Sequence, residues 1–191
     1  DEIVFLSNRE GPSQLWVTSL DGGTPRRLSE QAVPMDGDWR VNARVAPRWS
    51  SDGSTIAYLA PGDQGNTLWL IDPDGSDARQ TGLSGVLRVD WDLDNQRVVY
   101  TRNTRDGSGR IEMIATDLQT GAEVLLLEGH ATELSVSPDG SYVAYNSADG
   151  HFSMNRYLLP LTPSTVHPPP PPSAPPPPPR TACGAGPPPP R

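Results

Sequence analysis

The stretch RWSSDGSTIAYLA, residues 48–60, joins a polar turn to a short apolar segment, and the chain repeats this order. Residues 89–101 read VDWDLDNQRVVYT, and residues 134–146 read LSVSPDGSYVAYN. Aligned on Trp49, Trp91 and Val136, the three copies lie 42 and 45 residues apart. Self-similarity at such a period predicts stacked structural units, so the fold of one unit decides the fold of the chain.

A fourth copy, shorter at its front, precedes these three. The segment IVF at residues 3–5 matches IAY at residues 56–58, and LWV at residues 15–17 matches LWL at residues 68–70, both with an offset of 53. The offset exceeds the other spacings because of an insertion, EQAVPMDGDWRVN, at residues 30–42.

Turn chemistry predicts the structure of each unit. Gly53, Asn95 and Gly140 close the turns SSDG, DLDN and SPDG, and glycine and asparagine are the residues that most readily take a positive φ. Short strands with alternating or apolar character follow and precede these turns. They predict an all-β chain of fourteen strands, in units of three, four, four and three.

Four antiparallel strands in a unit of about 40–45 residues are typical of a β-propeller blade. The segments APRWSSDGSTIAYLA and LWLIDPDGSDARQT resemble the WD40-like repeats of TolB, of tricorn-type proteins and of the propellers of prolyl oligopeptidase relatives. The resemblance covers residues 1–161. We therefore expect about four consecutive blades in residues 1–161 that form an open, incomplete propeller, the first and last blades being incomplete.

The predicted strands do not close a ring, and we expect them to be a piece of a larger propeller. The chain begins at Asp1 without a methionine or a leader-like segment. This beginning is expected either from a removed signal or from an internal fragment.

Residues 162–191 are expected to form a proline-rich, disordered tail. Prolines occupy 14 of the 25 positions from His167 to Arg191, and proline supplies no backbone donor for a strand ladder. We expect a solvated linker in a polyproline II-like state; the alternative is a docking segment for an aromatic-lined groove.

Composition excludes two classes of partner. The net charge of −8 does not suit a surface that binds nucleic-acid phosphates. No apolar run approaches the roughly 20 residues of a membrane-spanning helix, so membrane insertion is not expected. The single cysteine, Cys183, leaves no disulfide framework.

The sequence predicts no catalytic residues, no metal site and no cofactor. The patterns GxSxG, GxGxxG, GxxxxGK[ST] and HExxH are absent, and the three histidines are scattered. The segment DPDGSD at residues 72–77 resembles part of a calcium loop, but it lacks the final glutamate and is interpreted as a hairpin turn. The tryptophans and tyrosines at repeated positions are expected to pack between blades.

The insertion supplies the predicted partner-binding residues because it is the long segment that does not repeat. Met35, Trp39, Arg40 and Arg44 lie in it or just beyond it, and tryptophan and arginine are enriched at binding hot spots. The alternative is that Trp39 only caps the neighbouring blade.

Two functions remain open. The resemblance to TolB implies a non-catalytic scaffold that binds a protein or peptide partner and is periplasmic or otherwise extracytoplasmic, with a cytoplasmic location left open. The resemblance to prolyl oligopeptidase-like and tricorn-like peptidases implies an accessory propeller that gates access to a catalytic domain absent from this sequence. Self-association through open blade faces is a further expectation.

Overall fold

The computed structural model describes residues 1–33, 45–148 and 154–161. Within these ranges the chain forms fourteen strands in four antiparallel sheets, as the repeat predicts. We number the sheets as blades 1 to 4 in chain order. Blades 1 and 4 have three strands each, and blades 2 and 3 have four.

Every blade is a meander in which consecutive strands pair. Blade 1 contains β1 (Glu2–Ser7), β2 (Gln14–Ser19) and β3 (Arg26–Arg27); blade 2 contains β4 (Arg48–Trp49), β5 (Ile56–Gly62), β6 (Gly65–Ile71) and β7 (Arg79–Ser84). Blade 3 contains β8 (Val86–Trp91), β9 (Arg97–Asn103), β10 (Ile111–Asp117) and β11 (Glu123–Gly129); blade 4 contains β12 (Glu133–Val136), β13 (Tyr142–Ala148) and β14 (Met154–Pro160).

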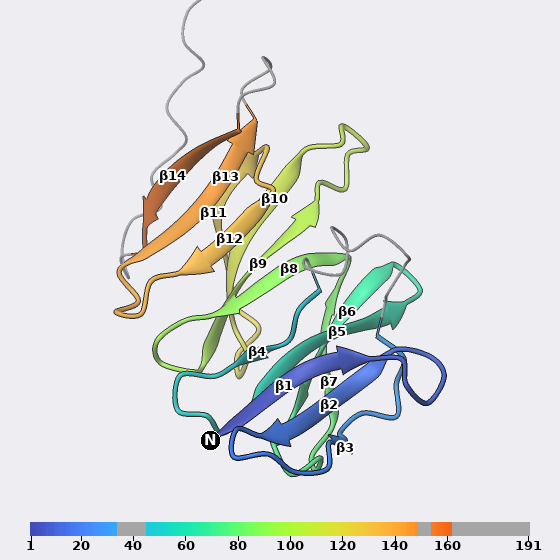
Figure 1. Cartoon of the computed structure of the whole chain (residues 1–191). Helices are drawn as coiled ribbons and strands as arrows, with labels where there is room; N and C mark the ends of the chain where they lie inside the picture. Colours follow the sequence, from blue (N-terminus) through green and yellow to red (C-terminus); the bar gives the residue numbers. More distant parts are fainter. Residues whose placement is uncertain (34–44, 149–153, 162–191) are drawn as a thin grey trace, which may run out of the picture.

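The blades follow one another in an open arc (Figure 1). The first strands of blades 2, 3 and 4 lie next to one another, because β8 contacts both β4 and β12. This is the arrangement of a propeller, in which the first strand of each blade lines the central axis.

The turn residues adopt the conformation that the sequence predicts. Gly53, Asn95 and Gly140 have φ values of 71°, 54° and 67°. In blades 2 and 4 a serine hydroxyl closes the turn: Ser50 Oγ donates to Asp52 Oδ1 at 2.7 Å, and Ser137 Oγ donates to Asp139 Oδ1 at 2.6 Å. The turns that interrupt the strand pattern are therefore built by local hydrogen bonds.

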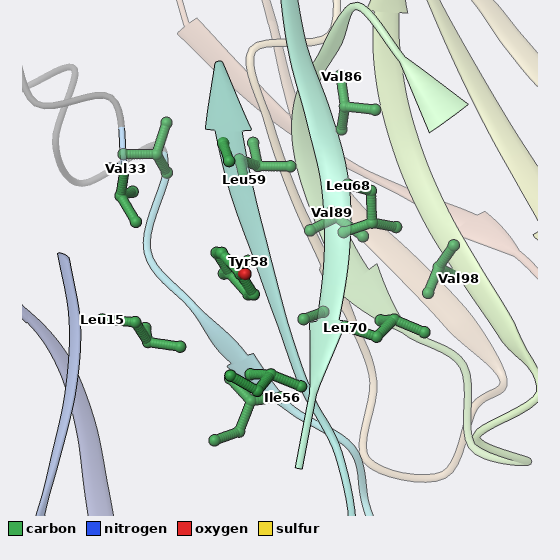
Figure 2. Packing of buried hydrophobic residues seen from close by; sticks show 14 of the residues in the cluster. Leu15, Val33, Ile56, Tyr58, Leu59, Leu68, Leu70, Val86, Val89 and Val98 are labelled. Atoms are coloured by element: carbon green, nitrogen blue, oxygen red, sulfur yellow. The ribbon is translucent and has the colours of Figure 1, made fainter. Parts of the chain in front are cut away.

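Successive side chains of a strand point to opposite faces of the sheet, and in these blades both faces carry apolar side chains. In blade 2, Tyr58 faces blade 1 and Leu70 faces blade 3, as Figure 2 shows with Leu15 on one side and Val98 on the other. One continuous cluster of buried side chains joins blades 1, 2 and 3, and a second joins blades 3 and 4. Full burial of each large apolar side chain contributes about 1.5–3 kcal/mol, so the blade junctions hold the fold together.

Most repeated aromatic residues lie between blades, as expected. Tyr58 and Tyr100 are fully buried and Trp91 is 7% exposed. Trp16 differs, because its neighbours on β2 point into the junction with blade 2 and Trp16 points the other way. It is nevertheless buried, with the guanidinium of Arg9 lying 5.0 Å from its ring centroid.

Candidate functional site

A groove of 620 Å³ lies between blades 3 and 4, on the side of the β8–β9 and β12–β13 turns. The two turns approach each other closely, since a Cβ built on Gly140 would lie 2.7 Å from the Cβ of Leu93. Residues of both turns and of the end of β14 line the groove: Asp92, Leu93, Asp94, Arg97, Asp139, Gly140, Ser141, Tyr142, Pro160 and Leu161.

The guanidinium of Arg97 is fixed at the blade 3 side of this groove. Its Nη2 lies 2.8 Å from Asp92 Oδ2, and its Nε lies 3.4 Å from Asp94 Oδ2. The Asp92 side chain is 7% exposed, and its Oδ1 accepts the backbone N–H of Leu93 at 2.7 Å. A buried charge paired in this way holds its turn in one geometry.

The groove carries net negative charge, with three aspartates against one arginine among its lining residues. The hydroxyl of Ser137 and the backbone N–H of Ser141 hold the pKa of Asp139 below its ordinary value. Asp139 is exposed, so its carboxylate stays charged at neutral pH and faces solvent.

Apolar side chains are exposed among these charges. Leu93 is 50% exposed and Tyr142 is 44% exposed. An apolar surface surrounded by charged groups is typical of a protein-binding site, where the apolar part supplies affinity and the polar rim supplies specificity.

Ser137 and Asp139 form a turn contact and not a nucleophile–base pair. The hydroxyl of Ser137 donates to Asp139 and accepts the backbone N–H of Tyr142 at 3.0 Å. The hydroxyl therefore both donates and accepts a hydrogen bond within the turn.

Polar contacts near the axis fix blades 2, 3 and 4 relative to one another. Asp90 Oδ2 accepts the backbone N–H of Val136 at 2.9 Å, and Asp90 Oδ1 lies 3.9 Å from Arg48 Nε. The indole Nε1 of Trp91 donates to the carbonyl of Arg48 at 3.0 Å. One strand, β8, thus makes polar contacts with the first strands of both neighbouring blades.

The predicted partner-binding residues Met35, Trp39, Arg40 and Arg44 lie outside the described residues, and they stay a prediction. The structure does place the two ends of the connection that carries them. Val33 and Val45 are both 3% exposed and belong to the cluster that joins blades 1, 2 and 3. The backbone N–H of Val33 also donates to the carbonyl of Ser13 at 2.7 Å.

Sequence reasoning missed the groove, although one signal was visible. Where the turns of blades 2 and 4 have Ser51 and Pro138, the blade 3 turn has Leu93. A large apolar residue in the middle of a polar turn has no packing role within the turn. Its exposure beside a second turn becomes evident only when the blades are placed together.

In the part of the chain that the structure describes, no three His, Cys, Asp or Glu side chains are close enough to hold a metal ion. The DPDGSD segment forms a hairpin turn in which Asp74 Oδ1 accepts the backbone N–H of Ser76 at 2.8 Å. The same part of the chain contains no helix that could span a membrane.

Curated proteins similar to this chain include two peptidases and a TolB homolog. The chain is 30% identical over 108 residues to dipeptidyl-peptidase 5 of Porphyromonas endodontalis, covering 54% of this chain and 14% of that protein. It is 34% identical over 92 residues to tricorn protease homolog 1 of Streptomyces coelicolor, covering 47% of this chain and 7% of that protein. It is 27% identical over 149 residues to the TolB homolog of Chlorobium luteolum, covering 76% of this chain and 31% of that protein. The chain thus spans less than a third of each of these relatives.

Solved structures give the same fold. TolB from Acinetobacter baumannii superimposes with a TM-score of 0.67 at 14% identity, over 83% of this chain and 38% of that chain. A prolyl endopeptidase superimposes with a TM-score of 0.59 at 16% identity, over 84% of this chain and 26% of that chain. An oligogalacturonate lyase superimposes with a TM-score of 0.58 at 18% identity, over 84% of this chain and 45% of that chain. No protein-family model matches the sequence. The chain is therefore an open stretch of β-propeller of the type found in TolB, tricorn and prolyl oligopeptidase-like proteins.

Proposed function

We propose that this chain is a non-catalytic propeller scaffold that binds a protein or peptide partner, as the likeness to TolB suggests. The observation that carries the proposal is the groove between blades 3 and 4, where exposed Leu93 and Tyr142 lie among aspartates. Support also comes from the TolB homolog, whose similarity extends over 76% of the chain.

The groove favours a segment that combines a large apolar side chain with an arginine or lysine. The apolar side chain would cover Leu93 and Tyr142, and the cation would approach Asp94 and Asp139, which are the exposed acids of the lining. Arg97 is already paired with Asp92 and Asp94, so it does not need an anion from the partner. Electrostatic complementarity of this kind raises the association rate and sets the orientation of the bound segment.

A site that is formed before binding suits this role. The inner strand β8 is tied to both neighbouring first strands through Asp90 and Trp91, so the two turns that form the groove do not need to be ordered on binding. A preformed site loses less conformational entropy on association than a flexible one. The likeness to TolB leads us to propose an extracytoplasmic location.

The experiment is selection of short peptides from a displayed random library on the folded chain, followed by fluorescence anisotropy with the selected peptides. We expect sequences with a basic residue next to a large apolar residue. Leu93→Asp should weaken their binding at least about tenfold, or about 1.4 kcal/mol. Leu125→Asp is the matched control, because Leu125 is also 50% exposed but lies on β11, away from the groove.

Equal binding by the wild type and Leu93→Asp would remove the groove from the proposal.

The same peptides and the variant Trp39→Ala test whether the insertion with Met35, Trp39, Arg40 and Arg44 is a second contact. A loss of about 2 kcal/mol with an unchanged fold is expected for a hot spot. Unfolding without a separate effect on binding would make Trp39 a structural cap.

A second candidate function is an accessory propeller that gates peptide access to a peptidase domain. It is favoured by the identities of 30% and 34% to a dipeptidyl peptidase and a tricorn protease homolog. The gene sequence following the codon of Leu161 distinguishes the two candidates: a downstream domain with GxSxG supports the peptidase, and further repeats support the scaffold.

In either role we propose that this chain itself has no hydrolase activity. A fluorophosphonate probe for reactive serines should leave the purified chain unlabelled. Stoichiometric labelling that one Ser→Ala change abolishes would overturn this part of the proposal.

A further inference from the structure

The chain runs directly from the lining of the groove between blades 3 and 4 into the tail, residues 162–191. Both walls of this groove come from described blades, and Pro160 and Leu161 belong to its lining. The backbone N–H of Leu161 donates to the carbonyl of Ser141 at 2.8 Å, which holds this end of blade 4 against the β12–β13 turn. The tail is therefore tethered at the groove itself.

The tail and the groove carry opposite charges. All 23 acidic residues of the chain lie in residues 1–161, whereas the tail contains no acid and two arginines, Arg180 and Arg191. The exposed acids of the groove lining are Asp94 and Asp139. Opposite charges on two tethered segments favour contact between them.

Each arginine of the tail directly follows a run of prolines. Prolines 175–179 precede Arg180, and prolines 187–190 precede Arg191. Proline fixes φ, so such a run is already extended and loses little conformational entropy on binding. Proline-rich segments bind surfaces that expose aromatic rings, and Tyr142 is 44% exposed in the groove. Each run thus places apolar rings next to a cation, which is the combination that suits the groove.

The length of the tail allows either run to return to the groove. Eighteen residues separate Leu161 from Arg180, and an extended proline-rich chain advances about 3.1 Å per residue. The residues at 173–174 (SA) and 181–186 (TACGAG) interrupt the runs without proline. Such interruptions are flexible compared with the proline runs, so the chain can reverse its direction there.

We propose that the proline runs 175–179 and 187–190, each with the arginine that follows it, occupy the groove of their own chain and compete with its partner. This inference rests on the proposed function of the groove. The proline rings would pack on Leu93 and Tyr142, and the arginine would approach Asp94 or Asp139. The tail then regulates the site, because a partner must displace it.

The competition is expected to be weak. A short tether gives each run a local concentration of the order of millimolar, but a single run makes only a small contact. We expect the tail to lower the affinity for a partner peptide about threefold, which corresponds to about 0.7 kcal/mol. A contact of this strength has little effect on the stability of the fold.

Cys183 makes the contact directly measurable, because it is the single cysteine of the chain and lies between the two arginines. A nitroxide label on Cys183 broadens the NMR signals of backbone amides close to it. We expect broadening in residues 92–97 and 139–142 of the labelled whole chain, without any peptide, and none in β7. Broadening that is absent from these two segments would overturn the proposal.

Two controls define the contact. Combined Arg180→Gln and Arg191→Gln should remove the broadening, and Arg105→Gln should leave it unchanged, because Arg105 is exposed on the β9–β10 loop at the other end of β9 from the groove. A mixture of labelled chain with isotope-enriched, unlabelled chain detects contact between copies. Equal broadening in that mixture would overturn a contact within one chain.

Fluorescence anisotropy with the selected peptides tests the regulation. The chain with Arg180→Gln and Arg191→Gln should bind them about threefold more tightly than the wild type, and Arg105→Gln should bind like the wild type. Unchanged affinity would overturn the regulation, even where Leu93→Asp still weakens binding and the proposed function stands. The NMR measurement needs no peptide, so it tests the tail contact separately from the proposed function.

Discussion

Asn95 shows how a single residue serves both the local turn and the neighbouring blade. Its φ of 54° is the conformation that glycine takes at the other two turns. Its side-chain oxygen accepts the backbone N–H of Ser51 at 2.7 Å and the hydroxyl of the same serine at 2.8 Å. The sequence predicted the positive φ, because the position is glycine in the other copies. It did not predict the bond to Ser51, which depends on the stacking of two turns 44 residues apart.

Trp91 allows a prediction about the blade junctions. It is 7% exposed, it packs in the cluster that joins blades 1, 2 and 3, and its Nε1 donates to the Arg48 carbonyl. Trp91→Ala should lower the free energy of unfolding by about 3–5 kcal/mol, as expected for truncation of a core aromatic residue. Trp49→Ala, at the same repeat position but only half-buried, should lower the free energy of unfolding by less. Urea titration of both variants makes the comparison. Equal losses would mean that burial at the junction does not set the cost.

Two buried tyrosines predict a loss of stability at alkaline pH. Burial raises the pKa of Tyr58 to about 12 and that of Tyr100 to about 12, above the value of about 10 in an unfolded chain. Between these pH values the unfolded state loses protons that the folded state keeps, so the free energy of unfolding falls as pH rises. Below about pH 10 both states are protonated, and this contribution is fully present.

The chain is suited to this measurement because its 15 basic residues are all arginines, which do not titrate below about pH 12. We expect the urea midpoint to fall between about pH 10 and 12, and Tyr58→Phe to reduce the fall. A midpoint that is independent of pH over this range would contradict the role given to the tyrosines.

At the scale of elements, the repeated turn determines how blades meet. Gly140 takes a φ of 67°, and a Cβ there would lie 2.7 Å from Leu93 Cβ and 3.3 Å from Asp92 Oδ1. Gly140→Ala should therefore lower the free energy of unfolding by more than the roughly 1–2 kcal/mol expected from left-handed backbone strain alone, because the blade 3 turn must also move. Gly121→Ala is the matched control, with a φ of 71° and no atom within 4 Å of the added Cβ.

Thermal unfolding of both glycine variants measures the difference. A larger loss for Gly140→Ala, together with weaker binding of the selected peptides, would show that the contact between the turns shapes the groove. Identical losses would mean that backbone strain is the whole effect.

The elements were largely predictable because their signals are local. The turns SSDG, DLDN and SPDG and the apolar strands between them are readable in single copies, and the predicted grouping of fourteen strands is confirmed over the described residues. The candidate site was not predictable from the sequence, because Leu93 and Tyr142 belong to different blades. The position of Trp16 was also incompletely predicted, since a repeat position does not reveal which blade face has no neighbour among the described blades.

At the scale of the whole molecule, the division into residues 1–161 and a proline-rich tail stays a prediction. Truncation after Leu161 should leave the melting temperature nearly unchanged, because a solvated proline-rich segment buries little apolar area. Scanning calorimetry of the two lengths makes the comparison. A large decrease on truncation would mean that the tail packs on a free blade face.

We propose that the groove between blades 3 and 4 binds the partner. Hydrogen–deuterium exchange of the whole chain, with and without a peptide selected from the displayed library, tests this location of the binding site. We predict slower exchange on binding in residues 92–97 and 139–142, with the outer strand β7 and the β2–β3 hairpin unchanged. Protection elsewhere, with these two segments unaffected, would show that the peptide does not bind in the groove.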